Sequence, residues 1–224
     1  MTLVINGTNI DRVGVVDDSA DTRDTISDEL KDAHVVPRPF DGPFTSLNEL
    51  LETVRAEVDA VVCDHHLSPR NYAPCTGAEA VGHWYQNHFP SVLVTRYEKA
   101  EIEEIRLFRR RIPALIPSDE ASPDNIVKGL ELCIGEFNNH FIPARKPWPN
   151  MFRIDDVEEA SNPIQVYVVI PGWNSEEAIR LPLEMFPADL RQHVKPDERF
   201  FAVINLGAEK QEDLYFDAIE YRGN

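Results

Sequence analysis

The first 141 residues alternate short apolar runs with segments of helical periodicity. The apolar runs predict five strands, at Val13–Val16, Val35–Val36, Ala60–Cys63, Ser91–Val94 and Ile112–Ile116. Between these runs, apolar side chains recur every three or four residues, which is typical of helices that pack one face on a sheet. Alternating strands and helices of this length predict an α/β domain with a five-stranded parallel sheet and helices on both of its faces.

Capping residues mark two of the predicted helices. Ser46 and Glu49 form a capping box before an apolar stripe that continues to Val58. Ser122 precedes a proline at the first helical position, and the apolar positions after it continue to Phe141. A further helix is predicted around Ile102, Ile105 and Phe108, which share one helical face.

A proline-rich stretch separates the two halves of the chain. Residues 142–149 contain three prolines, which lack an amide donor and fix the backbone, so we expect a linker without regular structure at 142–150. The sequence therefore predicts a first domain at 1–141 and a second domain at 151–224. A protease should cut the joint near Arg145 or Lys146.

The second half is rich in predicted strands. These strands are Gln165–Ile170, Ala178–Leu183, Phe200–Leu206 and Leu214–Tyr221, with one short helix at Ala188–Val194. We expect a small β-rich domain, a compact barrel or sandwich, that binds another protein.

Charge and composition exclude several classes of function. Thirty-nine acidic and 22 basic residues among 224 give a net charge of −17, which disfavours binding to nucleic acid or to an anionic membrane surface. The longest apolar runs are far shorter than the ~20 residues that span a bilayer. The N-terminus lacks the basic and apolar regions of a secretory signal, and three widely spaced cysteines suit a reducing compartment, so we expect a cytoplasmic protein.

Polar side chains follow three of the predicted strands. Asp17 and Asp18 come after the first strand, Asp64 after the third and Thr95 after the fourth. Because the carboxyl ends of parallel strands meet at one edge of the sheet, we expect these side chains to converge. Carboxylates brought together there would favour Mg²⁺, which prefers oxygen ligands, and would leave Asp64 as a candidate nucleophile for a phosphoryl group. Asp17 and Asp18 could instead cap the next helix. A zinc site at His65 and His66 is disfavoured, since no further ligands follow at a useful spacing.

Residues 10–141 resemble the receiver domain of two-component response regulators. The resemblance lies in the order of the strands and in the motifs VVDD, VVCDHHLSP, GAEAV, VLVTRY and IPALIPSD. It implies a flavodoxin-like fold in which Asp17 and Asp18 bind the metal and Asp64 accepts phosphate. It further implies that the backbone carbonyl of His66 is a metal ligand and that Thr95 is the hydroxyl switch residue.

The sequence departs from the receiver pattern at the end of the fifth strand. The family has a lysine there that pairs with the phosphoryl group, and this chain has Ile116, which cannot neutralise charge. Pro113 replaces the aromatic partner of the switch residue, and an insertion at residues 70–76 lies beside Asp64. Losing one charge-assisted contact to a phosphoryl group costs about 1.5–3 kcal/mol, which weakens a phosphorylated state without forbidding it.

The sequence leaves three functional hypotheses. The first is a pseudo-receiver: a non-enzymatic signalling adaptor that acts by protein–protein interaction. The second is a response regulator phosphorylated on Asp64 by a histidine kinase. The third is a metal-dependent hydrolase. It is the weakest of the three, because the sequence places no base, and no cation to offset transition-state charge, at the cluster. The expected partner is a protein, either a histidine kinase or an effector; a homo-oligomer is compatible with the sequence.

Overall fold

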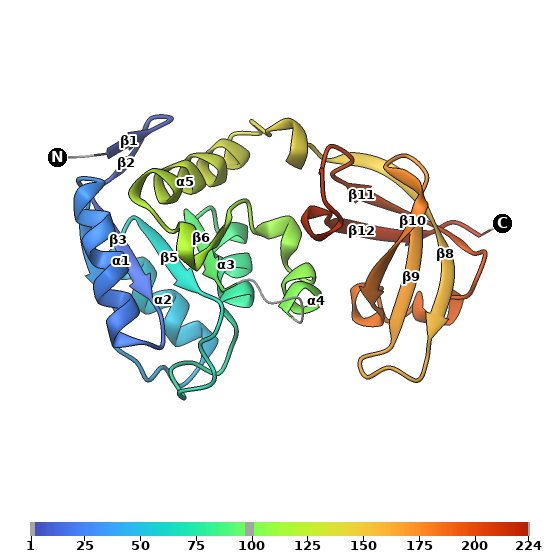
Figure 1. Cartoon of the computed structure of the whole chain (residues 1–224), viewed down its shortest axis with the longest axis horizontal. Helices are drawn as coiled ribbons and strands as arrows, with labels where there is room; N and C mark the ends of the chain where they lie inside the picture. Colours follow the sequence, from blue (N-terminus) through green and yellow to red (C-terminus); the bar gives the residue numbers. More distant parts are fainter. Residues whose placement is uncertain (1–2, 97–100, 224) are drawn as a thin grey trace. The chain divides into compact units, whose positions relative to one another are not determined.

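The computed structural model describes residues 3–96 and 101–223, which form two compact units (Figure 1). The N-terminal unit comprises residues 3–96 and 111–140. The C-terminal unit comprises residues 101–110 and 141–223. Residue 141 is the first residue of the second range of the C-terminal unit, and residues 101–110, which were predicted to belong to the first domain, group with that unit.

The N-terminal unit is built on a parallel sheet with the strand order β4-β3-β5-β6-β7. Its strands are β3 (Arg12–Val16), β4 (Val36–Pro39), β5 (Ala60–Asp64), β6 (Ser91–Thr95) and β7 (Leu115–Pro117). Numbered within the sheet, this order is 2-1-3-4-5, the flavodoxin-like arrangement. The predicted α/β fold class is confirmed.

Helices cover both faces of this sheet. They are α1 (Ala20–Asp32), α2 (Leu47–Glu57), α3 (Gly77–Gln86) and α5 (Pro123–Phe137). Helix α1 packs against α5, and α2 packs against α3. The predicted caps are present, since Ser46 accepts a hydrogen bond from the amide of Glu49 and Ser122 accepts one from the amide of Asn125.

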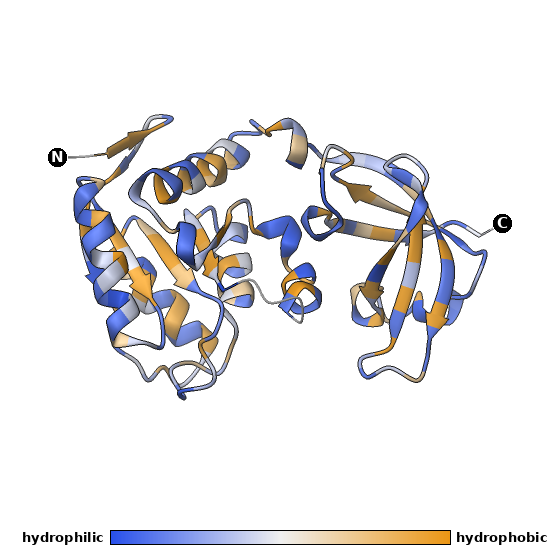
Figure 2. Ribbon diagram, viewed as in Figure 1, coloured by the Kyte–Doolittle hydropathy of each residue, from blue (hydrophilic) through white to orange (hydrophobic). Residues whose placement is uncertain are grey.

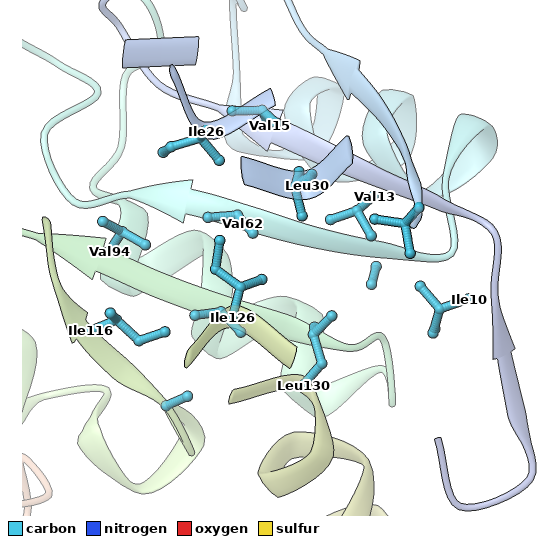
Figure 3. Close-up of a cluster of buried hydrophobic side chains, with 14 of the residues drawn as sticks. Ile10, Val13, Val15, Ile26, Leu30, Val62, Val94, Ile116, Ile126 and Leu130 are labelled. Atoms are coloured by element: carbon cyan, nitrogen blue, oxygen red, sulfur yellow. The ribbon is translucent and has the colours of Figure 1, made fainter. Parts of the chain in front are cut away.

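The core of the N-terminal unit lies between the sheet and the pair α1 and α5. Ile26 and Leu30 of α1 meet Ile126 and Leu130 of α5 over the strand residue Val62, and all five are buried (Figure 3). Apolar residues therefore fill the middle strands and one stripe of each helix (Figure 2), as the periodicity predicts.

A short hairpin precedes the sheet and was not predicted. Strands β1 (Leu3–Ile5) and β2 (Thr8–Ile10) pair antiparallel around Asn6-Gly7. Both turn residues have positive φ, 49° and 84°, and an Asn-Gly pair favours this backbone in a two-residue hairpin. Ile5 and Ile10 join the core of the N-terminal unit.

The C-terminal unit is one antiparallel sheet with the order β10-β9-β8-β11-β12. Its strands are β8 (Trp148–Glu158), β9 (Gln165–Ile170), β10 (Asn174–Pro182), β11 (Arg199–Ile204) and β12 (Phe216–Tyr221). Its core is aromatic: Phe152 packs against Phe186, Phe200 and Phe216. The β-rich prediction is confirmed. Of the predicted barrel or sandwich, the sandwich is wrong, because the described strands of this unit form one sheet.

Two local predictions in this half are also wrong. The predicted helix at Ala188–Val194 is only a 3₁₀ turn, Arg191–His193. Residues 142–150 are ordered: Pro143–Arg145 form a 3₁₀ turn and Trp148 begins β8. Pro149 is tolerated because, among the described strands, β8 pairs at this position with β11 alone, through Val203. Arg145 is buried, so of the two expected cleavage sites only Lys146 is exposed.

Candidate functional site

Three carboxylates converge at the carboxyl edge of the parallel sheet. Asp17 and Asp18 directly follow β3, and Asp64 is the last residue of β5, which pairs with β3 through Val16 and Cys63. One carboxylate oxygen from each aspartate lies within 4.8 Å of the other two. The predicted convergence of these three residues is therefore observed.

Backbone amides hold two of these carboxylates in place. The amide of Ser19 donates to Asp17 Oδ1 at 2.7 Å, and the amide of His66 donates to Asp64 Oδ2 at 2.8 Å. The first contact lies at the start of α1, where amides without helical partners favour an anion. Asp17 thus stands at a helix start and in the carboxylate cluster at once.

The loop after β5 approaches α3 closely at Gly77. Its amide donates to the carbonyl of His65 at 2.9 Å, and its α-carbon lies so near the carbonyl of Asp64 that a side chain has no room. A glycine at the first position of α3 thus lets this helix start directly beside Asp64.

Burial disfavours the charged forms of two of the three aspartates. Burial raises the pKa of Asp64 to about 7, and the charge of Asp17 adds to the rise, while the amide of His66 opposes it. Burial likewise raises the pKa of Asp17, although the amide of Ser19 opposes it. A divalent cation would relieve this cost, and three oxygen ligands at this spacing suit Mg²⁺. The residues therefore fit the metal that the resemblance implies.

Two arginines that sequence reasoning did not assign to the site lie at its border. Arg70 Nε lies 3.6 Å from Asp18 Oδ2, and its Nη1 donates to the Asp18 carbonyl at 3.4 Å. Arg23 Nη1 donates to the Asp17 carbonyl at 2.7 Å, and its Nη2 pairs with Asp41 at 2.8 Å. Both positive charges oppose the rise in the pKa of Asp17 that burial causes.

Each arginine has a signal in the sequence. Arg23 lies three and seven residues before Ile26 and Leu30, so it continues the buried stripe of α1 to the end nearest the carboxylates. Arg70 belongs to the insertion after Asp64. Tyr72 anchors that insertion by donating from its hydroxyl to the carbonyl of Phe40 at 2.8 Å.

The remaining predicted site residues lie at or near the same edge. Thr95 is the last residue of β6 and is fully buried, and β6 pairs with β5 through Val94 and Asp64. His66 contacts Asp64 through its amide, as described above. The assignments of the His66 carbonyl as a ligand and of Thr95 as a switch stay predictions.

Ile116 occupies the position where the resemblance implies a lysine. It lies in β7 opposite Val94, is 7% exposed and belongs to the same apolar cluster as Val94 and Ile126 (Figure 3). This side chain contributes to the core and brings no positive charge to the carboxylates.

Other sites considered in the sequence find no support. Within residues 3–96 and 101–223, the one group of three or more potential metal-ligating acids, histidines or cysteines is Asp17, Asp18 and Asp64, so His65 and His66 belong to no such zinc cluster. In the same part of the chain, every helix is too short or too polar to cross a bilayer.

Comparisons with known proteins bear on the N-terminal unit alone. No protein-family model matches the sequence, and no curated protein matches it. A response regulator receiver domain from Clostridium thermocellum is 11% identical with a TM-score of 0.44, covering 58% of this chain and 98% of that one. The chemotaxis response regulator CheY4 of Vibrio cholerae is 18% identical with a TM-score of 0.40, covering 55% and 98%. A receiver domain of an HD domain-containing protein from Pseudomonas fluorescens is 12% identical with a TM-score of 0.44, covering 58% and 90%. The strand order described above is the flavodoxin-like order, which receiver domains share with other proteins, and the N-terminal unit has a flavodoxin-like fold.

Proposed function

We propose that this chain is a non-enzymatic signalling adaptor of the cytoplasm, in which a receiver-like unit acts by binding other proteins. The observation that carries this proposal is the burial of Ile116 in the core. Ile116 stands where the resemblance implies a phosphate-binding lysine, and its apolar side chain cannot pair with a new negative charge on Asp64. A ligand shifts a conformational equilibrium only through its different interactions with the two states, so a phosphoryl group would have little effect here.

The carboxylate cluster fits this role as a metal site. Asp17, Asp18 and Asp64 would hold Mg²⁺, whose charge would offset the repulsion among them. The ion would supply electrostatic stabilisation at this edge of the sheet. The proposed role is metal binding without catalysis. It is consistent with the sequence, which places no general base beside these three aspartates.

The second candidate is a response regulator phosphorylated on Asp64 by a histidine kinase. Arg70 favours it, because the guanidinium lies 3.6 Å from Asp18 and brings positive charge to the edge of the site. This arginine is 62% exposed, so it can reorient at little cost. An arginine in a surface loop could therefore neutralise part of a phosphoryl charge that Ile116 cannot.

One measurement separates the two candidates. The full chain is incubated with acetyl phosphate and Mg²⁺, and its intact mass is recorded alongside that of Asp64→Asn. Because Ile116 offers no charge to offset a phosphoryl group, the adaptor proposal expects at most a trace of adduct on the wild type and none on Asp64→Asn. A larger phosphoryl adduct on the wild type that is absent from Asp64→Asn would favour the response regulator. Loss of that adduct in Arg70→Ala would then identify the compensating cation.

A further inference from the structure

Residues 101–110, here called the docking segment, belong to the C-terminal unit although they lie between β6 and β7 in the sequence. The segment contains α4 (Glu101–Arg106) and leads into a 3₁₀ turn at Arg109–Arg111. A helix of six residues is too short to be stable by itself in water. The surface on which it packs must therefore stabilise its conformation.

The acidic side of the docking segment is recognised through Glu103. Its carboxylate accepts a hydrogen bond from Gln165 Nε2 at 2.9 Å and pairs with Arg180 Nη1 at 2.8 Å. Both partners lie on neighbouring strands, β9 and β10. One carboxylate thus meets two donors from the sheet.

The basic side is recognised through Arg106 and Arg109, three and six residues after Glu103. Arg106 Nη1 donates to the carbonyls of Gln211 and Leu214 at 3.0 and 3.2 Å. Arg109 Nη2 pairs with Asp213 Oδ1 at 3.0 Å. The two arginines are 4% and 6% exposed. Burying cations at this depth is costly unless acceptors are placed for them, so these acceptors indicate a specific site.

Arg145 binds the backbone at the end of the docking segment. Its guanidinium donates to the carbonyls of Arg109 and Arg110 at 3.4 and 2.9 Å and lies over the ring of Tyr215. The hydroxyl of Tyr215 donates in return to the Arg145 carbonyl at 2.7 Å. The guanidinium of Arg110 also lies over this ring, 5.2 Å from its centroid. The backbone of the segment is thereby bound as well as its side chains.

We propose that the C-terminal unit carries a peptide-binding site for a short helix of the pattern Glu-x-x-Arg-x-x-Arg, and that this chain fills the site with its own residues 101–110. The site consists of Arg145, Gln165 and Arg180, together with the 3₁₀ turn Gln211–Asp213 and the two residues after it, Leu214 and Tyr215. The docking segment is a tethered ligand of this site, independent of any metal or phosphoryl group at Asp64.

The test cuts the chain between the docking segment and the rest of the site and measures whether the two fragments stay associated. A specific protease site is inserted between His140 and Phe141 of the full chain, and the cut protein is passed over a gel-filtration column. Fragment 1–140 carries the docking segment and fragment 141–224 carries the rest of the site. We expect the cut wild type to elute as one complex and cut Arg106→Ala/Arg109→Ala to elute as two fragments. Arg153→Ala, which removes an exposed pair with Asp155 elsewhere in the unit, is the matched control and should stay together.

A second experiment exchanges the charges of Glu103 and Arg180. It tests the same site even if Arg106→Ala/Arg109→Ala fails to fold. Arg180→Glu places two carboxylates together and should weaken the association of the cut fragments at least tenfold. Adding Glu103→Arg should restore it to within about threefold, because the new arginine can pair with the carboxylate introduced at position 180. It can also donate to Gln165 Oε1, a buried acceptor with no hydrogen-bond partner among residues 3–96 and 101–223. Separation of the cut wild type, persistence of the complex in Arg106→Ala/Arg109→Ala, or failure of the exchange to rescue would each overturn the proposal.

Discussion

The α-carbon of Gly77 packs against the backbone carbonyl of Asp64 so tightly that no other residue fits between α3 and the end of β5. The position of the candidate phosphoacceptor is thus fixed by a glycine 13 residues further along the chain. It also fixes where the loop carrying Arg70 must return to the sheet.

Gly77→Ala should destabilise the N-terminal unit by about 1–3 kcal/mol, since a methyl group there forces backbone to move. Urea unfolding followed by Trp84 fluorescence in a Trp148→Phe/Trp173→Phe background reports on this unit. Gly135→Ala is the control, because a methyl group on that helical glycine would meet nothing closer than the His140 carbonyl oxygen, at 3.2 Å. Equal stability of the two variants would contradict the close approach.

Magnesium should stabilise the wild type and not the variant Asp17→Asn/Asp18→Asn. The variant keeps the shape of the site but removes two of the three charges that favour the ion. Melting curves in EDTA and in increasing Mg²⁺ measure the effect. A shift of the same size in both proteins would show that the ion acts elsewhere.

Without metal, the stability of the N-terminal unit should fall as pH rises from about 4 to about 7. The pKa of Asp64 is raised to about 7 in the folded chain from its ordinary value of 3.8, so within this window the folded state binds a proton that the unfolded state has released. Urea unfolding of the same Trp84 reporter in EDTA, at several pH values, follows the effect. Asp64→Asn should flatten this part of the profile, and an unchanged slope would mean that Asp64 is not the group responsible.

Arg70→Ala should tighten Mg²⁺ binding by about two- to fivefold. The guanidinium beside Asp18 competes with the ion for the same carboxylate, and an exposed pair contributes up to about 1 kcal/mol. Calorimetric titration measures the affinity, and Arg70→Lys should remain near the wild type. Weaker binding in Arg70→Ala would instead mean that the arginine orients Asp18 for the metal.

The sequence predicts the parallel sheet well because each of its central strands is a continuous apolar run that ends in a polar residue. The carboxylate cluster follows from the same pattern, since β3 and β5 lie side by side. The hairpin at Asn6-Gly7 was missed although an Asn-Gly pair between short apolar strands signals it. Strand β8 was missed because prolines at and before its start suggest a linker, and only the one-sided pairing at Pro149 makes that residue acceptable.

The local sequence pattern could not predict which of the two units α4 packs against. Periodicity at Ile102, Ile105 and Phe108 indicates a helix but does not say which core receives it. The deciding partners are distant: Glu103 meets Gln165 across 62 positions, and Arg106 meets Leu214 across 108. Arg70 was missed as a site residue for a related reason, since the path of an inserted loop depends on anchors such as the contact of Tyr72 with Phe40.

The docking segment also has a consequence for the order of events during synthesis. Arg109 is made 104 residues before Asp213, so at about 5–20 residues per second it waits roughly 5–20 s for its partner. Throughout that time, three arginines and a short helix without intrinsic stability leave the ribosome with no surface to receive them. Translation speed through the second half of the message therefore sets how long this nascent chain stays open to competing partners.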